Sequence, residues 1–191
     1  ITMHEIRRRH LLAGAAAAVT GSPALAQGFP ERPVRVIVPF GPGGGTDNLV
    51  RLIDAHVRAA LGQPLVIENR AGAGGTIGGE LVARAPADGY TVLIVDSSFA
   101  INPSLFPRLP YDSAKDFAPV SLLATGPVIL LSHPSLPVNS LAELVAMAKA
   151  RPGQLSYASG GNGASTHLAG ELLKMVAGID LVHVPYRGTG P

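Results

Sequence analysis

The stretch VRVIVPFGPGGGTD, residues 34–47, places a β-branched run directly before a glycine-rich loop and a threonine. Strands that are buried on both faces of a parallel sheet have such continuous apolar runs. A threonine before a helical pattern can cap a helix, and Leu49, Val50, Ile53, Val57 and Leu61 recur at helical spacing. The stretch therefore predicts a strand over Val34–Val38, a glycine loop, and a helix that Thr46 caps and that runs to about Leu61.

The same order of strand, loop and helix recurs downstream. Strands are predicted over Leu65–Glu68 and Thr91–Val95, with a helix over Thr76–Ala85 between them. Because crossovers between parallel strands are right-handed, this βαβαβ order predicts a parallel sheet. Prolines interrupt the periodicity between Asn102 and Pro119, so a long surface excursion is expected there.

A second α/β unit is predicted from about residue 126. Ser140 and Glu143 form a capping-box pattern that opens a helix to about Ala150, and Gly178 closes a later helix. The other predicted elements are strand-like runs over Pro119–Leu123, Val128–Ser132, Leu155–Ala158 and Leu181–Val184, and a helix over Thr166–Ala177. The pattern predicts an α/β protein in which residues 27–125 and 126–191 belong to two successive units.

Residues 1–26 are predicted to be a secretory signal peptide. Three arginines at positions 7–9 precede an apolar run over Leu11–Val19, and Ala24-Leu25-Ala26 is a cleavage pattern. The run is too short to cross a bilayer, since a membrane helix needs about 20 apolar residues. The order Arg-Arg-His-Leu-Leu at 8–12 also resembles a twin-arginine export signal, so both export routes stay open. A periplasmic location is expected.

Charge and cysteine content exclude several classes of partner. The chain has 15 Lys and Arg against 13 Asp and Glu, and without the predicted signal it has 12 of each. A balanced chain without basic clusters does not predict a nucleic-acid or membrane-surface patch. The absence of cysteine excludes a disulfide, a thiol nucleophile and a lipoprotein anchor. His133, His167 and His183 lack metal-ligand spacing, so neither a metal nor a cofactor is expected.

Four small-residue loops each lie between a strand-like run and a helix start: Gly41–Asp47, Gly72–Gly79, Ser97-Ser98 and Ser159–His167. Ligands of open α/β sheets bind beyond the carboxyl ends of the strands, where helix N-termini present unpaired N–H groups. The first loop has no Lys or Arg, so N–H groups and hydroxyls would hold an anion there. This predicts a cleft that binds a dicarboxylate or an amino acid without chemistry. The candidate ligand-binding residues are Phe40, Gly43, Gly44, Gly45, Thr46, Gly74, Gly75, Thr76, Ser97, Ser98, Ser159, Gly163, Ser165, Thr166 and Tyr186.

Other polar residues near these loops are expected to have structural roles. Asp47 should complement the dipole of the first helix, since an acid would repel an anionic ligand. His167 is expected to bond to the backbone near a helix start, and His183 to pack within a strand. For Tyr186, a cleft role and a packing role both stay open.

No enzyme motif has the required spacing. Gly41–Asp47 lacks the Gly-Lys-Ser/Thr of a P-loop, and Ile77 stands where a dinucleotide-binding motif needs its third glycine. There is no Gly-x-Ser-x-Gly elbow. A hydrolase that uses Ser165 and His167 is one alternative, although neighbours two apart would need an unusual geometry. A module that contacts a partner protein and binds no ligand is another.

Several longer motifs resemble the Bug family of periplasmic solute-binding proteins, the TctC-like receptors of tripartite tricarboxylate transport systems. They span the whole segment after the predicted signal, in the family's order. The matching strings are VPFGPGGGTD at 38–47, ENRAGAGGTIG at 68–78, DGYT at 88–91, LPYD at 109–112, Asp116-Phe117, YAS at 157–159, Gly163, HLAGE at 167–171 and HVPYRG at 183–188.

This resemblance implies a two-lobed fold whose lobes close around a small carboxylate, and a monomer that delivers its ligand to membrane permease subunits. Family members continue well beyond the last matching motif, whereas this sequence stops at Pro191. A C-terminally truncated chain with both lobes incomplete is therefore expected, with uncovered sheet edges. The identity of the ligand does not follow from the sequence.

Overall fold

The structure is a computed structural model that describes residues 28–190, and the predicted signal peptide lies outside these residues. From Arg32 onward the chain forms one compact unit that contains two parallel sheets. Among the described residues, no helix is long and apolar enough to cross a membrane. The assignment of residues 27–125 and 126–191 to two lobes stays a prediction.

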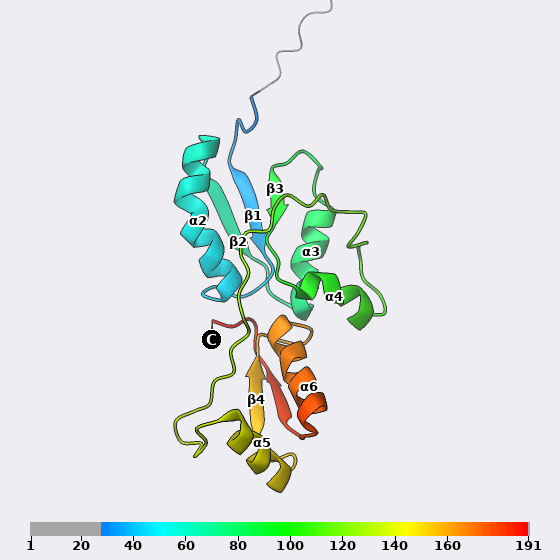
Figure 1. The fold of residues 1–191 in the computed structure, drawn as a ribbon. Helices are drawn as coiled ribbons and strands as arrows, with labels where there is room; N and C mark the ends of the chain where they lie inside the picture. The colour runs from blue at the N-terminus through cyan, green and yellow to red at the C-terminus, as the bar shows by residue number, and fades with distance from the viewer. Residues whose placement is uncertain (1–27, 191) are drawn as a thin grey trace, which may run out of the picture. The chain divides into compact units, whose positions relative to one another are not determined.

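The first sheet contains the three strands that the sequence predicts, all parallel. They are β1 (Val34–Val38), β2 (Leu65–Asn69) and β3 (Thr91–Leu93), in the order β2-β1-β3 (Figure 1). Val36 and Val38 of the central strand are buried against Val50 of the first helix. A β-branched strand between two neighbours needs few polar residues, and the one charged residue of β1, Arg35, pairs with Glu68 of β2 at 2.8 Å.

The helices of this half begin in glycine loops. They are α2 (Gly45–Leu61), the single-turn helix η2 (Ala73–Gly75) and α3 (Thr76–Ala83). The prediction that Thr46 caps α2 is wrong, because the N-cap is Gly44, which has no side chain that could bond to the helix. The extended backbone of Gly44 lets the helix start earlier, so that Thr46 becomes its second residue.

The second sheet pairs β4 (Ser156–Ser159) with β5 (Val182–Pro185) in parallel. Its helices are α5 (Leu141–Ala150) and α6 (Ser165–Ala177). The predicted capping box is confirmed: the Ser140 Oγ accepts from the Glu143 N–H at 3.2 Å. Gly178 ends α6 in the left-handed conformation, as predicted.

The excursion predicted from Asn102 is wrong at its start, because α4 (Ser98–Leu105) runs through Asn102 and Pro103. Packing of aromatic rings explains how this helix is kept despite its proline. The Phe99 ring lies 5.0 Å from the Phe117 ring and 6.0 Å from the Tyr111 ring, centroid to centroid. Ring contacts with the loop that follows α4 therefore outweigh the proline, which on its own predicts an interrupted helix.

The strands predicted over Pro119–Leu123 and Val128–Ser132 are also wrong. Residues 118–135 are exposed throughout, and no strand is assigned to them. Val120 is 88% exposed and Leu131 is 83% exposed. A strand needs a neighbour for its backbone N–H and C=O groups, and no other described segment pairs with these runs.

Candidate functional site

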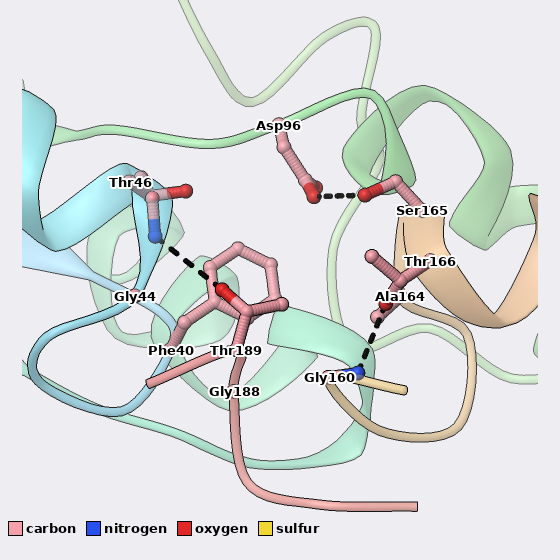
Figure 2. Close-up of a pocket in the computed structure, with 11 residues that line it drawn as sticks. Phe40, Gly44, Thr46, Asp96, Gly160, Ala164, Ser165, Thr166, Gly188 and Thr189 are labelled. Atoms are coloured by element: carbon pink, nitrogen blue, oxygen red, sulfur yellow. Dashed lines mark hydrogen bonds between the residues drawn. The ribbon is translucent and has the colours of Figure 1, made fainter. Parts of the chain in front are cut away.

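A small pocket lies where the starts of α2 and α6 meet (Figure 2). It has a volume of about 30 Å³, enough for ordered water but far below the roughly 300 Å³ at which small-molecule sites begin. Its lining residues are Phe40, Gly44, Gly45, Thr46, Asp96, Gly160, Ala164, Ser165, Thr166, Gly188 and Thr189. Six of the fifteen candidate residues therefore come together in one place.

The α2 wall is built from the glycine loop after β1. Gly44 is buried, and the N–H of Gly45 donates to the Thr189 Oγ1 at 3.4 Å. The first N–H groups of a helix have no acceptor inside the helix and lie at the positive end of its dipole. The loop also touches the last described residues, since the Gly41 N–H donates to the Arg187 carbonyl oxygen at 3.1 Å.

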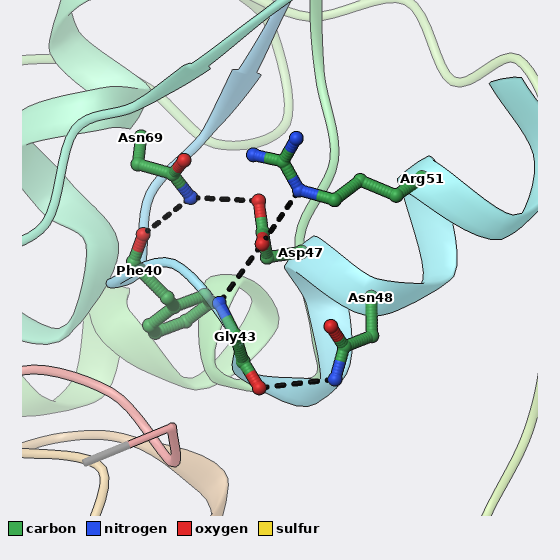
Figure 3. Close-up of polar contacts among 6 residues, drawn as sticks. All are labelled: Phe40, Gly43, Asp47, Asn48, Arg51 and Asn69. Carbon is green, nitrogen blue, oxygen red and sulfur yellow. Dashed lines mark hydrogen bonds and ion pairs between the residues drawn. The ribbon is translucent and has the colours of Figure 1, made fainter.

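Asp47 holds this loop in place and does not line the pocket (Figure 3). Its Oδ2 accepts from the Gly43 N–H and from the Arg51 Nε, both at 2.9 Å, and its Oδ1 accepts from the Asn69 Nδ2 at 3.0 Å. The hydrogen bond from Arg51 is the main reason that the pKa of Asp47 is lowered to about 2, although burial opposes it. The structural role expected for Asp47 is confirmed. The N–H of Gly43 is already donated to Asp47, so Gly43 is not the free donor that the sequence suggested.

The α6 wall is polar. The Ser165 Oγ donates to the Asp96 Oδ2 at 2.7 Å, and the Thr166 Oγ1 accepts from the Gly160 N–H at 2.9 Å (Figure 2). The Asp96 Oδ1 also accepts from the N–H of Ser98 at 3.0 Å and from the Ser98 hydroxyl. Asp96 thus joins the start of α4 to the start of α6.

The remaining nine candidates do not line this pocket: Gly43, Gly74, Gly75, Thr76, Ser97, Ser98, Ser159, Gly163 and Tyr186. The carbonyl oxygen of Gly74 accepts from the Asn102 Nδ2 at 3.1 Å, and Gly75, Thr76 and Gly163 are buried. Ser97 is exposed and is the N-cap of α4. Tyr186 is 48% exposed.

Ser159 lies in a polar cluster next to the pocket. Its Oγ lies 2.6 Å from the His183 Nε2, and the His183 ring stacks on the rings of Tyr157 and His167. Burial is the main cause that lowers the pKa of His183, and the nearby His167 lowers it further. The packed role expected for His183 is confirmed. The backbone role expected for His167 is confirmed as well, because its Nδ1 accepts from the Gly163 N–H at 3.2 Å.

Sequence reasoning missed five lining residues, namely Asp96, Gly160, Ala164, Gly188 and Thr189. Asp96 had a usable signal, because it directly follows the strand predicted over Thr91–Val95 and precedes the Ser97-Ser98 pair. Thr189 had none, since nothing in its neighbourhood predicts that the last described residues lie against α2. Among residues 28–190, no group of three or more His, Cys, Asp or Glu side chains could hold a metal ion.

Comparisons with known proteins agree on one family. A family model described as the tripartite tricarboxylate transporter family receptor, TctC, matches residues 49–191. The chain is 45% identical over 189 residues to the UPF0065 protein in the tcbD-tcbE intergenic region of Pseudomonas sp. strain P51, covering 97% of this chain and 56% of that protein. It is 42% identical over 178 residues to protein BugT of Bordetella pertussis, covering 92% of this chain and 55% of BugT. The chain thus spans about half the length of the curated relatives it matches.

Several solved structures have a fold similar to that of this chain. The periplasmic binding protein BugD matches with a TM-score of 0.78 and 38% identity, covering 85% of this chain and 55% of BugD. MatC of Rhodopseudomonas palustris, solved with bound malate, matches with a TM-score of 0.78 and 40% identity, covering 85% of this chain and 56% of MatC. Rpa4515 of R. palustris, solved with adipate, matches with a TM-score of 0.73 and 39% identity, covering 84% of this chain and 54% of Rpa4515. The fold is thus that of periplasmic binding proteins, and the chain belongs to the TctC family of tripartite tricarboxylate transporter receptors.

Proposed function

We propose that this chain is part of a periplasmic solute-binding receptor and that it binds a small organic acid at the starts of α2 and α6. The observation that carries the proposal is the meeting of these two helix starts in one pocket, lined by Gly44, Thr46, Ser165 and Thr166. Two positive dipole ends together favour an anion there, without any Lys or Arg in the lining. The malate and adipate held by MatC and Rpa4515 support an organic acid as the ligand.

The size of the pocket implies that its walls separate when the ligand enters. A volume of about 30 Å³ does not admit a four-carbon dicarboxylate. Several hydrogen bonds join the two sides of the pocket, among them those from Ser165 to Asp96 and from Gly45 to Thr189. These hydrogen bonds are lost when the pocket opens, and hydrogen bonds to the ligand replace them. The walls then close around the ligand, as expected of a two-lobed receptor. The receptor then delivers the ligand to the permease subunits of a tripartite tricarboxylate transporter, after export by the signal at residues 1–26.

The pairings of the polar groups do not favour a hydrolase. Ser165 gives its hydroxyl hydrogen to Asp96, and the Nδ1 of His167 is occupied by the Gly163 N–H. A serine nucleophile requires a base that accepts its proton, and here His167 is bonded to the backbone instead. We infer that the site binds its ligand without chemistry.

A thermal-shift experiment with malate, succinate, adipate, citrate and glutamate tests this proposal. A ligand at 100 times its Kd stabilises a protein by about 2.7 kcal/mol, which raises the Tm by roughly 5–10 °C for a chain of this size. We expect such a rise with at least one of the acids, and its loss in Gly44→Val, whose side chain would fill the α2 wall. The absence of any shift would contradict ligand binding and would favour a module that only contacts a partner.

A further inference from the structure

The pocket contains one group that a simple carboxylate ligand would avoid. Asp96 lines it, whereas the other polar side chains of the lining are the hydroxyls of Thr46, Ser165, Thr166 and Thr189. A carboxylate ligand that lies directly against the Asp96 carboxylate would be repelled by it. The helix starts therefore favour an anion at one part of the pocket, and Asp96 disfavours one at another.

The hydrogen bonds of Asp96 show what it can still accept. An ionised carboxylate has about four lone-pair sites on its two oxygens. The N–H and the hydroxyl of Ser98 use two of them at Oδ1, and the hydroxyl of Ser165 uses one at Oδ2. One site remains, on the oxygen that already faces Ser165.

Ser165 also presents hydrogen-bond acceptors at the Asp96 end of the pocket. Its single hydroxyl hydrogen goes to Asp96, so it presents only lone pairs to the pocket. The sequence suggested a hydroxyl donor at this position, whereas the paired hydroxyl acts as an acceptor. If the pocket opens and the pair separates, Asp96 gains a further free lone pair, and the Ser165 hydroxyl regains a hydrogen that it can donate. In both arrangements the Asp96 carboxylate accepts hydrogen bonds.

We propose that Asp96 makes the site selective for organic acids that carry a hydroxyl or ammonium donor near the carboxylate, over the same acids without that donor. The proposal rests on the proposed function, because the helix starts must hold the carboxylate. The donor then occupies the free lone pair of the Asp96 Oδ2. A hydroxyl and an ammonium share this hydrogen-bond chemistry, and an ammonium adds attraction between opposite charges.

Isothermal titration calorimetry with matched acids tests the selectivity. Succinate, malate and aspartate differ only in the group at the second carbon, and adipate and 2-aminoadipate repeat the comparison at six carbons. Hydrogen bonds to charged groups correspond to differences of about 10-fold to 100-fold in Kd, so we expect the donor-bearing acid to bind more tightly than its parent by this factor. A larger preference for aspartate than for malate would identify an ammonium as the donor, and the reverse order would identify a hydroxyl.

Two variants separate the role of Asp96 from general effects of charge. Asp96→Asn keeps the size and an acceptor for the Ser98 N–H, and we expect it to reduce the preference for the donor-bearing acid about 10-fold or more. The matched control is Asp54→Asn, which removes a carboxylate that pairs with Arg58 on α2 and does not line the pocket. It should leave the preference unchanged.

The outcomes distinguish this inference from the proposed function. If the unchanged chain binds succinate as tightly as malate and aspartate, the selectivity is refuted without recourse to any variant, while acid binding stands. An unaltered preference in Asp96→Asn refutes the role of Asp96. If none of these acids binds, the proposed function fails and the inference fails with it.

Discussion

The substitution Asp47→Asn should destabilise the fold by about 1–2 kcal/mol at neutral pH. Asp47 is 1% exposed and accepts three hydrogen bonds, from Gly43, Arg51 and Asn69. These partners lower its pKa from 3.8 to about 2, and one pKa unit corresponds to about 1.4 kcal/mol, so the full shift is worth about 2 kcal/mol. Solvent around the half-exposed Arg51 side chain screens part of this value.

The pH dependence identifies the cause. Because the folded-state pKa of Asp47 lies below its unfolded value, the stabilisation is complete above about pH 5 and is lost as the pH falls through about 2. Asparagine does not titrate, so the gap between the two proteins should narrow by about half at pH 3. Urea unfolding at pH 7 and pH 3 measures the free energy of unfolding of both proteins.

The matched control is Asp54→Asn, which breaks a 3.0 Å pair with Arg58 on the same helix. An i,i+4 pair of this kind contributes about 0.3–0.5 kcal/mol. If Asp47→Asn costs no more than Asp54→Asn, or if its cost is the same at both pH values, the buried carboxylate does not stabilise the loop.

Three further substitutions test the site and the packing. Gly44→Val places a Cβ 3.1 Å from the Thr189 Oγ1 and should weaken acid binding about 10-fold or more in calorimetry. The control Gly126→Ala, whose Cβ meets no atom within 4 Å, should leave the affinity unchanged. Equal affinities of the two variants would show that Gly44 is not part of the site. Gly170→Ala drives a Cβ into the ring of Tyr157 and should cost about 1–3 kcal/mol in urea unfolding, and no loss of stability would contradict this packing. Ser140→Ala removes the cap of α5 and should cost about 1 kcal/mol in the same assay, so an unchanged unfolding midpoint would show that the cap contributes nothing.

The sequence correctly predicts those helices and strands whose own residues show a periodic apolar pattern or a residue typical of a helix end. The strand Val34–Val38 has its predicted bounds, and Ser140 and Gly178 stand at the helix ends that they predict. Elements that depend on distant partners were not predictable in this way. The helix around Pro103 is kept by rings that follow in the next loop, and the runs after Pro119 read as strands because a sequence does not show whether a neighbouring strand is there.

The candidate site shows the same division. Loops at helix starts were recognisable from glycine and hydroxyl residues, and six of the candidates meet in the pocket. Asp96 was not among the candidates, which were chosen for their glycine and hydroxyl groups. Its role depends on Ser165, which is 69 positions away in the sequence, and no local pattern joins the two.

The exposed runs after Pro119 affect how the chain behaves at high concentration. No Asp, Glu, Lys or Arg stands between Asp116 and Glu143, so no charge in this stretch keeps two molecules apart. Apolar segments of high β-propensity without charge are the ones that associate as intermolecular strands. Such association is driven by burial of apolar surface and gains strength on warming from low temperature. The chain should therefore stay monodisperse longest when it is dilute and cold, and salt screening should alter its aggregation little.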